Sequence, residues 1–134
     1  MIDIENMLFT KIATALRSEF SGIFVTGEYV NAPSKFPAVY IVEMDNTVNR
    51  AGRDTSGLEH FADVMYQVDI FSNKNNGKKA ECKAIAAFID DMFAEMGFTR
   101  SYLNPVPNID NSTIYRLTGR WIATVGKDNT VYRR

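Results

Sequence analysis

The chain has 134 residues, of which 46% are hydrophobic and 23% charged, a balance that excludes a disordered or membrane-embedded protein and predicts a single domain over residues 1–134. Its formal net charge of −1 gives no global field to attract nucleic acid or an anionic membrane. The single cysteine, Cys82, excludes an internal disulfide and a thiolate zinc cluster, and a start without signal-peptide features predicts a cytoplasmic protein.

The first helix is predicted to begin at Asp3, as N-cap, and to end at Ser21-Gly22. Its apolar side chains recur at helical spacing: Leu8, Phe9, Ile12, Ala15 and Leu16. A short strand is predicted over residues 23–30, followed by a connector with two prolines over residues 31–37. Residues 38–45 are predicted to form a strand inside the sheet.

The chain turns polar between Asp45 and Leu58, which predicts a long hairpin tip before a return strand over residues 59–72. In that strand Val64, Tyr66, Val68 and Ile70 are expected on one face. The other face is mixed, with Asp63, Gln67 and Asp69 beside Met65 and Phe71. Asparagines between Ser72 and Gly77 are candidate caps for a second helix, which Gly97 is predicted to end.

The second helix carries an apolar stripe and, on its other side, few long polar side chains. The stripe contains Cys82, Ile85, Ile89, Met92, Phe93 and Met96. The other side contains Ala80, Ala84, Ala87, Asp91 and Ala94. A strand over residues 98–103, broken by residues 104–108, and a last strand over residues 113–125 with a bulge at Gly119 complete the chain.

These elements predict an α+β fold in the order α-β-β-β-α-β-β. Hairpin connections favour a mostly antiparallel sheet of about four to five strands, with both amphipathic helices packed on one face of it.

Residues that could carry catalysis are scattered, and we expect no enzyme, no cofactor and no metal site. His60 is the only histidine and stands beside a polar loop, and Cys82 lies on the apolar stripe of a helix, where a buried, inert thiol is expected. Asp90, Asp91 and Glu95 diverge at helical spacing, whereas a metal needs oxygens that converge. The glycines are isolated, so they form no phosphate-binding loop.

Several stretches, taken in order, resemble the tail terminator or tail completion proteins of long-tailed bacteriophages and prophages. They are the first helix, residues 33–41, residues 66–79 with Tyr66-Gln67-Val68-Asp69-Ile70-Phe71-Ser72-Asn73 and Gly77-Lys78-Lys79, and residues 114–120 with the sequence Ile114-Tyr115-Arg116-Leu117-Thr118-Gly119-Arg120. The resemblance spans nearly the whole chain and rests on order and spacing, because the family has no catalytic signature.

The resemblance implies a sheet with helices on one side and a ring, usually of six copies, that caps the tail tube, stops its polymerisation and presents a surface for head docking. The implied partners are other copies of the chain, the tail tube protein and the head-tail connector protein, in the host bacterial cytoplasm during assembly and then in the virion tail. A closed ring needs two patches that fit head to tail. The candidates are Asn49, Arg50, Arg53 and Asp54 on the hairpin tip, and Ala84, Ala87 and Asp91 on the second helix.

Three alternatives stay open. A head-tail connector or other neck component has the same size and lacks catalytic signals in the same way. A ligand-binding module or small enzyme predicts a deep apolar pocket with convergent polar groups. An RNA-binding sheet predicts exposed aromatic side chains and a basic face, whereas alternation places Arg116 and Arg120 opposite Tyr115 and Trp121. We therefore expect no recognition of nucleic-acid sequence.

Overall fold

The computed structural model describes residues 1–28, 33–49, 61–107 and 113–132. These residues form an α+β fold with two helices on a mostly antiparallel sheet, as the sequence predicts. The sheet has six strands rather than four to five, because the short β6 is not predicted from the sequence. The elements in chain order are α1 (Glu5–Glu19), β1 (Phe24–Thr26), β2 (Ala38–Val48), β3 (Phe61–Ser72), α2 (Lys78–Glu95), β4 (Thr99–Val106), β5 (Tyr115–Gly126) and β6 (Val131–Tyr132).

The sheet has the strand order β1-β2-β3-β5-β4, and the short β6 pairs with β5 at the end of the sheet that β4 leaves uncovered. Adjacent strands are antiparallel except β1, which runs parallel to β2 with Phe24 opposite Ala38. This exception departs from the predicted hairpin connection. The residues between β1 and β2 are numerous enough to carry the chain back across the sheet, as a parallel pair requires.

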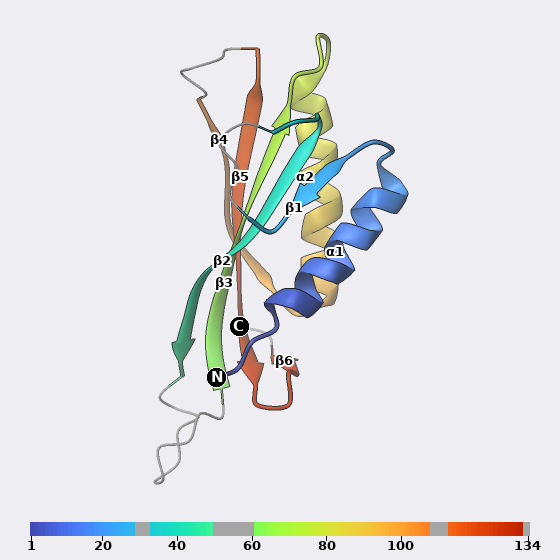
Figure 1. Ribbon diagram of the computed structural model, residues 1–134. Coiled ribbons are helices and arrows are strands. Elements are labelled where there is room, and N and C mark those ends of the chain that lie inside the picture. Colours follow the sequence, from blue (N-terminus) through green and yellow to red (C-terminus); the bar gives the residue numbers. More distant parts are fainter. Residues whose placement is uncertain (29–32, 50–60, 108–112, 133–134) are drawn as a thin grey trace, which may run out of the picture.

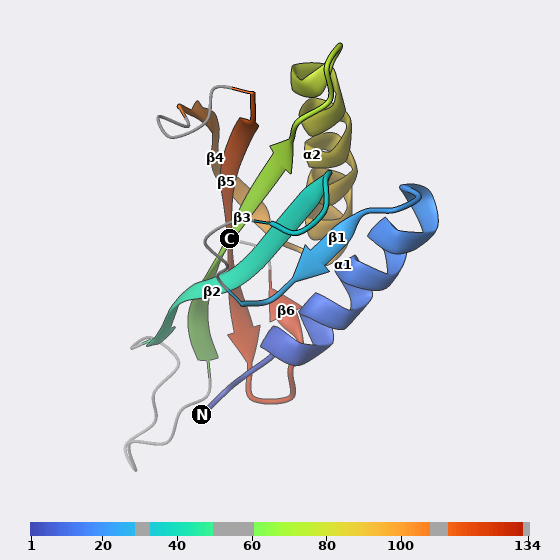
Figure 2. The same cartoon turned by 45° about the horizontal axis from the view of Figure 1, so that its top comes forward.

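Both helices lie on the same face of the sheet, as predicted (Figure 1). Figure 2 shows α1 and α2 side by side there, with α1 nearer β1 and α2 behind β3 and β5. Their buried side chains meet the inward residues of β3 and β5, among which Trp121 stacks on Phe93 with ring centroids 4.8 Å apart. The predicted alternation of Val64, Tyr66, Val68 and Ile70 toward this core is confirmed.

The end of α2 is also as predicted, because Gly97 adopts the left-handed conformation with φ of 93°. The amide of Gly97 donates to the carbonyl of Ala94, and the amide of Phe98 donates to that of Phe93. The Phe93 and Phe98 rings pack 5.1 Å apart, which completes a Schellman motif and starts β4 in the right direction.

The predicted helix starts are wrong at both helices. Ile4, not Asp3, is the N-cap of α1, although an Asp3 carboxylate oxygen accepts the amide of Glu5. At α2 the N-cap is Gly77, in the left-handed conformation, and no asparagine side chain caps the helix. A side-chain cap needs extended backbone at the N-cap, so the left-handed Gly77 leaves no place for one.

Strand boundaries differ from the predictions wherever neighbouring strands extend an element. β2 continues to Val48 because its last residues pair with β3, so part of the predicted hairpin tip is strand. β4 continues through Pro105 to Val106, which is tolerated because β4 is an edge strand of the sheet. Of the strand predicted over residues 23–30, only Phe24–Thr26 is strand in the structure. The last two residues of that range belong to the segment 29–32, which lies outside the described residues.

The predicted bulge at Gly119 is wrong, because the register of β5 with β3 and β4 is continuous there. The irregularities lie instead in β2, between Glu43 and Asp45, and in β4, between Arg100 and Tyr102. Gly119 has a packing role: a Cβ atom there would lie 2.7 Å from the Trp121 ring and 2.9 Å from Leu103. The glycine makes room for the indole.

Candidate functional site

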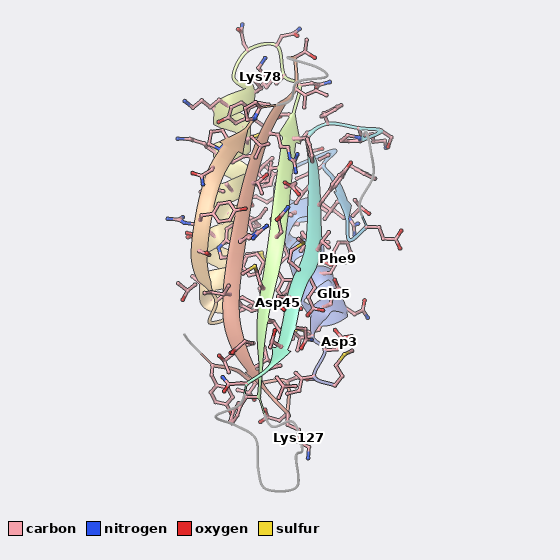
Figure 3. The ribbon with its side chains drawn as sticks, turned by 90° about the vertical axis from the view of Figure 1, so that its left-hand side faces the viewer. Asp3, Glu5, Phe9, Asp45, Lys78 and Lys127 are labelled. Atoms are coloured by element: carbon pink, nitrogen blue, oxygen red, sulfur yellow. The ribbon has the colours of Figure 1, made fainter. Side chains whose placement is uncertain are left out.

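The face of the sheet opposite the helices carries a network of polar side chains, seen toward the viewer in Figure 3. Asp69 of β3 lies at its centre, with its side chain only 8% exposed. Its carboxylate accepts hydrogen bonds from Nε and an Nη of Arg116 at 3.1 and 3.0 Å, and from the hydroxyl of Thr118. The other carboxylate oxygen accepts from Gln67 at 3.1 Å. Four donors hold this one carboxylate in place.

The network continues along the sheet on both sides of Asp69. Gln67 accepts a hydrogen bond from Arg120 Nε at 3.0 Å, and the Arg120 guanidinium lies over the Tyr102 ring. Toward β1, the open face becomes apolar, with a small cluster separate from the main core. This cluster contains Ala38, Tyr40 and Phe71, with Phe24, Phe36 and Ile114 packed against it. We call the polar network and this cluster the open face.

The polar groups of the open face are engaged with one another. Its polar side chains form hydrogen bonds with one another, and the guanidinium of Arg116 also lies over the Phe71 ring. Trp121, which base stacking would need exposed, is fully buried on the helix side. The arrangement suits recognition by shape over a broad area.

A pocket of about 540 Å³ lies between α1 and the β1–β2 side of the sheet. Phe9, Val25 and Ile41 give it apolar walls, while carboxylates and one guanidinium surround them. Its lining is Asp3, Glu5, Asn6, Phe9, Arg17, Val25, Thr26, Gly27, Glu28 and Ile41. We call it the acidic groove. Its volume lies within the range of pockets that enclose small ligands.

Two of the lining carboxylates, Asp3 and Glu5, meet Glu43, which does not line the acidic groove: oxygens of the three lie within 4.8 Å of one another. Glu5 accepts the amide of Glu43 at 3.1 Å, and Glu43 accepts the Tyr66 hydroxyl at 3.0 Å. Oxygen ligands of this kind suit a hard cation. Sequence reasoning missed the group because Glu43 is far along the chain from Asp3 and Glu5, and only packing of α1 on β2 brings them together.

Burial raises the pKa of Glu43 above its usual 4.5; the Tyr66 hydrogen bond lowers it, and the neighbouring Glu5 and Asp3 raise it further. Burial next to Glu43 raises the pKa of Tyr66 far above its usual value, so Tyr66 remains a hydrogen-bond donor. Burial also raises the pKa of Cys82 to about 12, and Cys82 is fully buried, as the sequence predicts.

The predicted interface residues fall into three groups. Ala84, Ala87 and Asp91 are exposed on the side of α2 that faces away from the sheet. Asn49 is half-buried at the end of β2, where its amide donates to the carbonyl of Phe61 and its side chain donates to Asp63. Arg50, Arg53 and Asp54 lie outside the described residues, as does His60. The structure does not bring the α2 group and Asn49 together.

The acidic residues near the end of α2 diverge, as predicted. Asp90 accepts hydrogen bonds from Arg100 and from the Trp121 indole, while Asp91 and Glu95 are exposed. The start of α2 carries the opposite charge. Four lysines lie at this start or just before it: Lys74, Lys78, Lys79 and Lys83. None of them forms an ion pair with a carboxylate of the residues that the structure describes. We call these four the basic end.

No protein-family model matches this chain, and no curated protein matches it. Among the described residues, neither helix is both long and apolar enough to cross a membrane.

Proposed function

We propose that the chain is a structural subunit of the tail of a long-tailed bacteriophage or prophage. Copies of it form a ring that caps the tail tube, stops tube polymerisation and provides the surface on which the head docks. The role is mechanical: a ring that covers the end of a helical polymer removes the surface on which the next tube ring would add.

One observation carries the proposal, which is the open face. Both helices cover the other face, so a broad sheet surface remains for contact with another protein. Asp69 and Arg116 at its centre hold each other in place, so little side-chain conformational freedom is lost on docking. The order of sequence stretches that resembles tail terminators supports the same proposal.

Deletion of the gene from a prophage that produces particles tests the role directly. Electron microscopy is expected to show tails of uncontrolled length that carry no heads, and the wild-type gene supplied in trans is expected to restore both. Tails of normal length on infectious particles after deletion would rule the proposal out.

A complementation series tests the ring. Ala84→Lys with Ala87→Lys places two charges on the exposed side of α2, where close approach of a neighbour needs small side chains. This variant is expected to fold and to fail in complementation. Thr14→Lys, a charge added at an exposed position of α1, is the control and is expected to complement.

The acidic groove favours a second candidate function, a ligand-binding module. Its volume and its converging carboxylates are what such a module would need. Thermal unfolding of the protein with a panel of polyamines, amino acids and divalent cations separates the two functions. A ligand that raises the unfolding temperature of wild type and not of Asp3→Asn with Glu28→Gln would favour the module.

A further inference from the structure

Two surfaces of this chain carry charges mainly of opposite sign, although the charges nearly cancel in total. The basic end carries four ammonium groups with no described carboxylate partner, while Asp3, Glu5 and Glu28 line the acidic groove. Figure 3 shows Lys78 at one end of the long axis and Asp3 and Glu5 toward the other. The two surfaces of one molecule therefore cannot meet each other.

The basic end is unfavourable in the isolated chain. Positive side chains at a helix start oppose the helix dipole, and α2 has no side-chain cap there and no basic residue in its last turn. Glu81, the acidic residue of the first turn, accepts a hydrogen bond from Ser72. An anionic surface that approaches these lysines would make this charge distribution favourable. We therefore expect the surface that binds the basic end to be acidic.

The acidic groove has the matching chemistry. Its apolar walls, Phe9 and Ile41, suit the methylene chain of a lysine, while the carboxylates of Asp3 and Glu28 suit the ammonium group. Both carboxylates belong to exposed residues, and neither forms an ion pair with a described cation. Its volume of about 540 Å³ leaves room for a lysine side chain.

We propose that the basic end of one copy docks into the acidic groove of a second copy, and that this is the head-to-tail contact between subunits. Two different patches on one chain are what a heterologous contact requires, and such contacts close into rings when the rotation between copies allows it. The inference rests on the proposed function only in identifying the assembly as a ring, because the contact itself is a property of the isolated protein.

Two neutral variants test the contact by sedimentation velocity at low salt. The first, Lys78→Gln with Lys79→Gln, keeps the groove and removes two of the four charges of the basic end. The second, Asp3→Asn with Glu28→Gln, keeps the basic end and loses the groove, and it spares Glu5 because that carboxylate accepts the amide of Glu43. Lys127→Gln removes an exposed lysine that lies far from Lys78 and is the control.

Wild type and the control are expected to self-associate, with a dissociation constant that rises with salt. Each variant alone is expected to lose about tenfold or more in self-association. An equimolar mixture of the two variants is expected to form a heterodimer and nothing larger, because one intact patch remains on each partner. The heterodimer also demonstrates that both variants are folded.

A monomeric wild type at every protein concentration would overturn the proposal, and so would variants that associate as wild type does. Two further results would overturn it in favour of another occupant. The first is a Lys78→Gln, Lys79→Gln variant that self-associates as wild type does but is no longer retained on immobilised DNA. The second is an Asp3→Asn, Glu28→Gln variant that self-associates as wild type does but no longer binds Mg²⁺. Heterodimer formation together with normal tails after gene deletion would leave the contact standing and remove the proposed function.

Discussion

The two faces of the sheet are built from alternate residues of the same strands, yet different forces hold them. On the covered face Trp121, Phe93 and Tyr66 are fully buried, so burial of apolar area stabilises that side. On the open face Asp69 and Arg116 hold each other by hydrogen bonds, and the surface stays available. Most apolar burial therefore lies on the covered face, while hydrogen bonds and the small cluster around Tyr40 stabilise the open face.

The largest effect is expected from the covered face. Trp121→Ala removes the stack on Phe93 and the hydrogen bond to Asp90 at 2.9 Å, so the free energy of unfolding should fall by about 3–5 kcal/mol. Urea unfolding followed by circular dichroism measures it. Ile122→Ala, at the next residue on the open face, is half-buried and should lose only about 1 kcal/mol. Equal losses would contradict the contrast between the faces.

The open face should respond next, at its central carboxylate. Asp69→Ala leaves Arg116, Thr118 and Gln67 without their acceptor, and we expect a loss of about 2–3 kcal/mol. This loss of unfolding free energy is smaller than for a fully buried ion pair, because the Arg116 side chain is 29% exposed and water can hydrate its guanidinium. Asp63→Ala, on the same strand and face, removes two acceptor contacts and should lose about 1 kcal/mol. A loss at Asp69 no larger than at Asp63 would show that the network is not structural.

A smaller effect is expected from overpacking the covered face. Gly119→Ala places a Cβ atom against Trp121 and Leu103, and we expect a loss of about 1–2 kcal/mol in the same unfolding assay. Gly27→Ala is the matched control, since its Cβ atom would meet Phe9 at 3.5 Å, an ordinary contact. An unchanged Gly119→Ala variant would mean that the indole has room to shift.

The smallest effect, and one of opposite sign, is expected at Glu43, beside Asp3 and Glu5. The folded protein raises the pKa of Glu43, so the protonated form favours folding, and this contribution is lost as pH rises from 4.5 through the folded pKa. Glu43→Gln keeps an acceptor for Tyr66 and removes the charge. Above that window it should therefore be more stable than wild type, by less than about 1 kcal/mol because Glu43 is partly exposed.

Unfolding free energies measured across this pH range check the prediction. The difference between Glu43→Gln and wild type should grow as pH rises through the folded pKa of Glu43. A difference that shrinks with rising pH would show that Glu43 is stabilised as a carboxylate.

The sequence by itself determined the local features. Alternation placed Val64, Tyr66, Val68 and Ile70 in the core, and Gly97 marked the end of α2, because side-chain period and backbone freedom act within a few residues. The α+β class and the single covered face followed from these local patterns.

Only the tertiary structure decided what distant segments do together. The parallel direction of β1, the passage of β4 through Pro105, the ion pair of Asp69 with Arg116 and the meeting of Glu5 with Glu43 all depend on which strands are neighbours and in which register. Register is fixed by packing between elements far apart in the chain, so no local pattern carries it. The open face and the acidic groove arise from that packing.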